Sequence, residues 1–205
     1  MTYSIIARCP HTGRLGIGTT TTSLACGRRN ESVRPNVGFS KLQAMYVRAH
    51  DPRALNLLAS GFTPRAVMKV VEENDDDFDF RQTGIIDREG NVVAHTGANC
   101  GKWAGHKVGP YYAAFGNWLT APAVVEGLVE SFMAHPDLPL EDRLLFAIEG
   151  DRKAGGQEAP RNPKAERSAW LRVVGQNDYS EIDLPSVTLT ITVPRKTTYL
   201  SHASP

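Results

Sequence analysis

The order of the strand and helix signals is the feature that most limits how this chain of 205 residues can fold. Apolar positions with helical spacing come in two adjacent pairs of segments. Segments rich in β-branched residues, separated by turn residues, lie before, between and after these pairs. This order suits antiparallel sheets with helices grouped on their outer faces better than a strict alternation of strand and helix. It therefore predicts an α+β fold.

The predicted strands form an N-terminal hairpin, a central group and a C-terminal pair. Turn residues at 10–13 and 88–91 mark the two hairpins, and the polar stretch 30–36 is predicted to be a loop. The strands that we expect are Tyr3–Cys9, Leu15–Thr22, Val37–Ala44, Phe80–Asp87, Val92–Thr96, Tyr111–Trp118, Ser168–Val174 and Val187–Val193.

Two sequence pairs, Asp51–Pro52 and Thr63–Pro64, each combine an N-cap residue with proline at the first helical turn, which predicts that a helix begins there. Gly61 ends the first of these helices. Amphipathic patterns over 122–134 and 140–149 predict two more.

The composition excludes several classes of protein. The formal net charge is +1, so no electrostatic footprint for nucleic acid or an anionic membrane is visible. No run approaches the ~18 apolar residues of a membrane span, and the N-terminus lacks a signal-peptide pattern, so we expect a cytoplasmic protein. The three cysteines include no CxxC pair and the histidines are scattered, so we expect no disulfide framework, no metal and no cofactor.

Thr2 is the first candidate for chemistry. An aminopeptidase removes Met1 readily when the second residue is small, and Thr2 would then carry a hydroxyl nucleophile and an α-amine on one residue. That amine has a reference pKa of about 7.7 to 8 and can act as a base near neutral pH. The alternative is an ordinary initiator methionine followed by a common second residue.

Polar segments farther along the chain supply further candidates, each with a structural alternative. The run Thr19, Thr20, Thr21, Thr22 and Ser23 can line a pocket, or it can face solvent from a strand. Arg81 can clamp a substrate carboxylate, or it can form a salt bridge with the acidic loop 74–77.

Three later residues complete the set of candidates. His95 can be a general base at a strand end or a structural histidine. The amide of Asn117 can donate a hydrogen bond to an oxyanion. Glu158 can be an acid or base, can pair with the α-ammonium of Thr2, or can belong to a surface loop.

Several of these blocks together resemble one family. The matching stretches are 1–8, 12–17, 25–27, 55–61, 80–82 with Asp87, 95–98, 116–117 and 154–158. In this order they resemble the DUF1028 proteins of the N-terminal nucleophile hydrolase superfamily. The resemblance implies a four-layer αββα sandwich of two stacked antiparallel sheets. It also implies amide-bond hydrolysis by an exposed N-terminal residue, and some members are linked to aminomuconate-type intermediates of aromatic degradation.

We therefore expect one domain over 1–205, with an atypical tail from about residue 184. The expected function is that of an amidase or deaminase that hydrolyses an amide or other C–N bond of a small, polar, carboxylate-bearing substrate. Thr2 would attack, or in a deaminase Glu158 or His95 would activate water. The rival is a non-catalytic small-molecule binding protein on the same scaffold. We expect a homo-oligomer without nucleic-acid or membrane partners.

Overall fold

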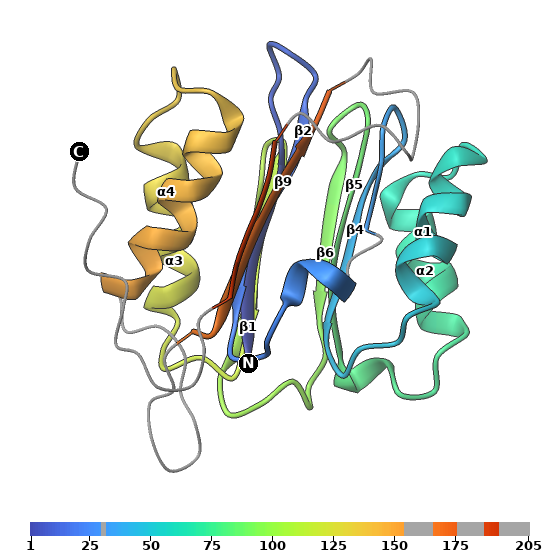
Figure 1. The fold of residues 1–205 in the computed structure, drawn as a ribbon. Helices are drawn as coiled ribbons and strands as arrows, with labels where there is room; N and C mark the ends of the chain where they lie inside the picture. Colours follow the sequence, from blue (N-terminus) through green and yellow to red (C-terminus); the bar gives the residue numbers. More distant parts are fainter. Residues whose placement is uncertain (30–31, 154–165, 176–186, 193–205) are drawn as a thin grey trace.

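A computed structural model of the chain describes residues 1–29, 32–153, 166–175 and 187–192. Within these ranges, two antiparallel sheets lie face to face between two pairs of helices (Figure 1). The layers follow the order helix, sheet, sheet, helix. The predicted α+β fold and its four layers are confirmed.

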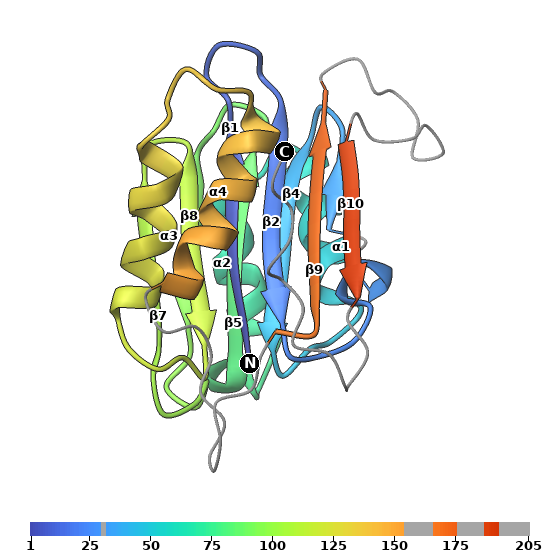
Figure 2. The same cartoon turned by 60° about the vertical axis from the view of Figure 1, so that its left-hand side comes forward.

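The larger sheet has six strands in the order β10-β9-β2-β1-β8-β7, and Figure 2 shows this sheet with α3 and α4 in front of part of it. The N-terminal strand β1 lies between β2 and β8, with both neighbours antiparallel to it. The bounds are β1 Thr2–Arg8, β2 Leu15–Thr21, β7 Ala104–Gly109, β8 Tyr112–Asn117, β9 Ser168–Val174 and β10 Val187–Thr192.

The smaller sheet has four strands in the order β3-β4-β5-β6. In Figure 1, α1 and α2 cover its outer face, while α3 and α4 cover the outer face of the larger sheet. The bounds are β3 Val33–Arg34, β4 Gly38–Ala44, β5 Arg81–Asp87, β6 Val92–Thr96, α1 His50–Ala59, α2 Pro64–Glu73, α3 Ala123–Met133 and α4 Leu140–Lys153, with short 3₁₀ turns at Cys26–Arg29 and Phe78–Phe80.

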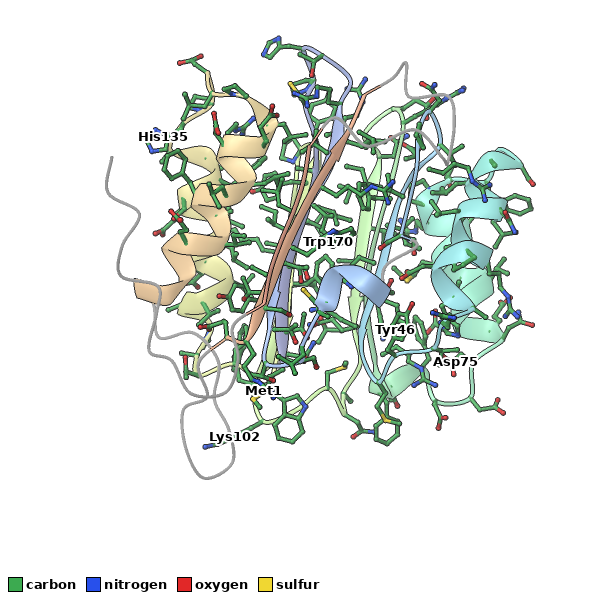
Figure 3. All side chains as sticks on the ribbon, viewed as in Figure 1. Met1, Tyr46, Asp75, Lys102, His135 and Trp170 are labelled. Carbon is green, nitrogen blue, oxygen red and sulfur yellow. The ribbon has the colours of Figure 1, made fainter. Side chains whose placement is uncertain are left out.

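Each of the three interfaces between layers holds its own apolar cluster. Ile5 faces α3 and α4, whereas its neighbour Ile6 faces the other sheet, as the alternation of side chains along a strand requires. Trp170 of β9 also lies between the sheets (Figure 3). The sheets approach closely at Gly84, where a Cβ atom would lie 2.5 Å from the ring of Phe115.

Every predicted strand is present, with ends within one residue of those expected. The short β3 falls in the stretch predicted to be a loop, and β7 was not predicted at all. Strand β7 has the sequence AGHKVG at the edge of its sheet, and three of its six side chains are exposed. Its two glycines and its charge hide the alternation that marks other strands. No helix in the described ranges is long and apolar enough to cross a membrane.

The predicted N-cap role of Asp51 is wrong. Ala49 is the N-cap residue of α1, with no side-chain cap, and Asp51 lies inside the first turn. Its carboxylate Oδ1 instead accepts hydrogen bonds from the Ser40 hydroxyl at 2.8 Å and the Leu42 N–H at 2.9 Å. At α2 the prediction is confirmed, because the Thr63 hydroxyl caps the helix.

Candidate active site

Thr2 lies at the end of β1, with its side chain on the face that meets the smaller sheet. Ser4, two residues farther along, shares this face, because its hydroxyl donates to Oε1 of Gln43 in β4 at 2.8 Å. Thr21 is the partner of Thr2 on β2, and the two Oγ1 atoms are 3.0 Å apart. The hydroxyl of Thr2 is therefore held at one end of the layer between the sheets.

The direction of this hydrogen bond follows from the other contacts of Thr21. The Thr21 hydroxyl donates its one proton to the carbonyl oxygen of Met1 at 2.7 Å. Its oxygen accepts from the N–H of Ser23 at 3.2 Å. The proton between the two threonines must then come from Thr2. This leaves the lone pairs of Thr2 Oγ1 available for attack on an electrophile.

Two donors converge on the carbonyl oxygen of the Met1–Thr2 peptide bond. One is the Thr21 hydroxyl, and the other is the backbone N–H of Thr22 at a longer 3.4 Å. In Figure 3 Met1 lies at one end of the sheets. Burial lowers the pKa of the Met1 α-amine from its usual 8.0. An acyl oxygen next to the Thr2 hydroxyl thus has hydrogen-bond donors in place.

A buried network of side-chain amides continues from this end of β1 between the sheets. Gln82 of β5 is its centre and is fully buried. Its Nε2 donates to the carbonyl oxygens of Gly116 at 2.7 Å and Gly105 at 3.1 Å, which lie on the opposite sheet. Its Oε1 accepts from Gln43 Nε2 at 2.7 Å and Asn117 Nδ2 at 3.0 Å. Gln82 thus ties the two sheets together beside Thr2.

The network reaches the protein surface through β6 and β7. Gln82 Nε2 also contacts Thr96 Oγ1 at 3.0 Å, and Thr96 Oγ1 lies 2.9 Å from Nδ1 of the exposed His106. Partial burial of its ring lowers the pKa of His106. A polar path therefore connects the interior near Thr2 with the edge of β7.

Asn117 lies directly beside Thr2. It is the partner of Thr2 on β8 and is fully buried, and its bond to Gln82 shows that its side chain also points between the sheets. Thr21, Thr2 and Asn117 therefore stand in a row on three adjacent strands.

The backbone leaves these strand ends in unusual conformations. Ala44, the last residue of β4, has a positive φ angle of 70°. Trp118, just after β8, and Ala25, after β2, each have a φ angle of 52°. Non-glycine residues rarely adopt this region, and such strain gathers at functional sites. The segments just beyond these strand ends carry exposed large apolar side chains, namely Leu24, Met45, Tyr46 and Trp118, and Phe80 just before β5 is exposed as well.

The structure directs two of the predicted site residues away from Thr2. Arg81 alternates with Gln82 and so faces the helices, where it forms a two-point contact with Asp75 at 2.8 and 3.2 Å. The hydrogen bond from Arg81 lowers the pKa of Asp75. His95 alternates with Thr96 and stacks on Phe78 with ring centroids 4.0 Å apart. For both residues, the geometry favours the structural alternative.

The predicted hydroxyl residues 19–23 lie on both faces of β2 and just beyond its end. Thr21 faces Thr2, and the backbone of Thr22 and Ser23 contributes the donors described above. Thr20 points to the opposite face, toward α3 and α4. Glu158 lies outside the described residues. Sequence reasoning missed Ser4 and Gln43. Thr2 and Ser4 alternate with apolar residues in β1, and this alternation is a signal for Ser4. In β4 the polar residues stand at 40, 41 and 43, so no alternation marks Gln43.

The comparisons with known proteins identify the family. A family model described as "Family of unknown function (DUF1028)" matches residues 2–191. The chain belongs to the DUF1028 family. Among curated proteins, none matches the sequence.

One solved structure agrees with this assignment. A crystal structure of a DUF1028 protein from Silicibacter pomeroyi is 29% identical, with a TM-score of 0.80 over 95% of this chain and 82% of that chain. A structure of Thiobacillus denitrificans BPH in complex with epoxomicin is 10% identical, with a TM-score of 0.47 over 86% of this chain and 100% of that chain. The second likeness is too slight to carry an argument.

This DUF1028 protein also buries a carboxyl group away from Thr2. Burial raises the pKa of Asp51 from 3.8 to about 7, against the opposing effects of nearby Lys41 and of the hydrogen bonds from Ser40 and Leu42. A carboxyl whose pKa is higher in the folded state stabilises the fold while protonated. Its contribution is full below about pH 4 and is lost as pH rises toward 7.

We therefore expect Asp51→Asn to flatten the dependence of stability on pH. The amide oxygen can still accept from Ser40 and Leu42, and the amide carries no charge that burial penalises. Between about pH 4 and 7, the free energy of unfolding of the wild type should fall relative to that of the variant by an amount on the order of 3 kcal/mol. Urea unfolding of both proteins across this range measures it, and parallel curves would contradict the role given to Asp51.

Proposed function

We propose that this protein is an N-terminal nucleophile hydrolase that cleaves an amide or other C–N bond of a small molecule, with Thr2 as the nucleophile after removal of Met1. The observation that carries the proposal is the arrangement around the Met1 carbonyl. Its oxygen accepts from the Thr21 hydroxyl and the Thr22 N–H, beside a Thr2 hydroxyl with available lone pairs. Once Met1 has left, a substrate carbonyl can take its place between the same donors.

The reaction then follows in two halves. The Thr2 oxygen attacks the carbonyl carbon, and its proton passes to the Thr2 α-amine. The oxyanion that forms accepts from Thr21 and Thr22. When the C–N bond breaks, the α-ammonium returns the proton to the departing nitrogen and an ester on Thr2 remains. Water attacks this ester, again losing a proton to the α-amine, and the acid leaves as the Thr2 hydroxyl is restored.

The surroundings suit an amine that acts as a base. The described elements that meet at this end contribute mostly hydroxyl and amide side chains between the sheets, and burial already lowers the pKa of the Met1 amine. A similar loss of hydration would lower the pKa of the Thr2 amine and so favour its action as a base near neutral pH. Glu158, which remains a proposed partner of this amine, lies outside the described residues.

A turnover screen tests the proposed function. The full chain is incubated with small primary amides, N-substituted amides and aminomuconate-type acids, and the release of ammonia or amine is measured beside a thermal-shift assay of the same compounds. The proposal expects at least one compound to be both a stabilising ligand and a substrate. Stabilisation by ligands without any release of ammonia or amine would instead support the non-catalytic binding protein.

A further inference from the structure

One buried hydrogen-bond acceptor beside Thr2 is left without a donor. Oδ1 of Asn117 is inaccessible to solvent and has no hydrogen-bond partner in the described part of the chain. Buried acceptors are nearly always paired in folded proteins. An unpaired one next to a candidate nucleophile points to a donor that is present only in another state of the site.

The orientation of this amide is determined by its neighbours. Gln82 Nε2 faces the carbonyl oxygens of Gly105 and Gly116, which can only accept, so Gln82 Oε1 must be the atom that faces Asn117. That oxygen needs a donor, which is Asn117 Nδ2 at 3.0 Å. Rotation of the Asn117 amide by 180° would set two oxygens against each other. Oδ1 is therefore the atom of the Asn117 amide that points away from Gln82.

The peptide geometry at Met1 shows where a new donor would appear. The Met1 carbonyl points to β2, since Thr21 and Thr22 donate to it. In a trans peptide the following N–H points the opposite way, so the nitrogen of Thr2 directs its hydrogen toward β8. Strand β8 is the strand of Asn117, which is the register partner of Thr2.

We propose that Asn117 is a positioning residue whose Oδ1 accepts a hydrogen bond from the free α-amine of Thr2 once Met1 has been removed. The inference rests on the proposed function in one respect, namely that the mature chain begins at Thr2. An α-ammonium has three hydrogens where the peptide has one, so it can donate to Asn117 Oδ1 and still have hydrogens for other acceptors. Gln82 takes part by holding the Asn117 amide in place.

This contact would set the protonation behaviour of the amine. A hydrogen bond to the charged form favours that form, so Asn117 raises the pKa of the Thr2 amine against the effect of burial. Within the described residues, the other polar and charged groups on this face include Ser4 on β1, Thr19 and Thr21 on β2, Lys41 and Gln43 on β4, Gln82 on β5, and His106 behind Thr96 at the edge of β7. Of these groups and Asn117, only Asn117 lies next to Thr2 on β8, the strand toward which the Thr2 nitrogen points.

The direct test is a crystal structure of the full chain beginning at Thr2, obtained by cleavage of an N-terminal fusion. The proposal expects the Thr2 nitrogen within hydrogen-bond distance of Asn117 Oδ1, at about 2.7 to 3.2 Å. A Thr2 nitrogen turned toward β2, with Asn117 Oδ1 still unpaired, would overturn it. Because this measurement needs no substrate, it gives a result whether or not the protein proves to be a hydrolase.

Titration of the Thr2 amine adds a readout that a purely structural role would not change. The pKa is followed by NMR of the chain labelled with ¹³C-threonine. It should fall by about one unit in Asn117→Leu, which lacks the acceptor, and rise by about one unit or more in Asn117→Asp, which adds a negative charge. Thr12→Ala, at the far end of the β1–β2 hairpin, serves as the control. Unchanged pKa values in the folded variants would contradict the proposal.

Discussion

Replacement of Thr2 by alanine should abolish hydrolysis of any substrate that the turnover screen identifies. The Thr2 hydroxyl is the group that the proposed mechanism requires as nucleophile, and alanine leaves nothing that can form the ester intermediate. The loss in kcat should be on the order of 10³-fold or more. Alanine is also small, so removal of Met1 should proceed as in the wild type, and ammonia or amine release at saturating substrate measures the effect.

Two further variants make this result specific. Thr2→Ser retains a hydroxyl in the same place and should keep part of the activity. Thr12→Ala changes a threonine in the turn of the same hairpin, far from Thr2, and should leave kcat unchanged. Activity retained in Thr2→Ala would show that Thr2 is not the nucleophile, and a deaminase that activates water without a covalent intermediate would then be the better account.

The second large effect concerns Gln82, the amide at the centre of the network. Leucine has a similar volume but no polar atoms. Gln82→Leu therefore removes the hydrogen bonds to the carbonyl oxygens of Gly105 and Gly116, and it removes the acceptor that the amides of Gln43 and Asn117 share. Each buried group left unpaired costs about 1 to 3 kcal/mol. Since some of these groups can find other partners, we expect a total loss of about 3 to 5 kcal/mol in the free energy of unfolding.

Chemical denaturation of the purified variant measures this loss. Asn99→Ala provides the matched control, because Asn99 is an exposed amide and its removal should change stability by no more than about 0.5 kcal/mol. A Gln82→Leu protein as stable as the control would show that the amide network contributes little to holding the two sheets together.

Much of the fold could be predicted from local patterns. Strands such as Ser168–Val174 and Val92–Thr96 were predicted with their observed bounds, because turn residues and β-branched runs mark them in the sequence. The order of strands and paired helices along the chain then leaves few ways to bury the apolar faces of the strands and helices. Strand β7 was missed because its main chain pairs with β8, while its side chains show no alternation of apolar and polar residues.

The candidate site could be predicted only in part, because it depends on which face of each strand a residue occupies. The sequence shows that Thr2 can become an N-terminal nucleophile and that Thr21 belongs to a hydroxyl-rich strand. It does not show that Arg81 turns to Asp75 while its neighbour Gln82 turns to Asn117. A shift of one residue along a strand exchanges these roles. Long-range partners such as Gln43 are also invisible until the two sheets are stacked.

The central claim is that Thr2 becomes the N-terminus and its hydroxyl becomes the nucleophile. Intact mass spectrometry of the purified, untagged chain tests the first half most directly. We expect a mass that lacks one methionine residue, with the same loss in Thr2→Ala. A chain that retains Met1 would contradict the account, because the Thr2 nitrogen would remain in a peptide bond and could not serve as the base.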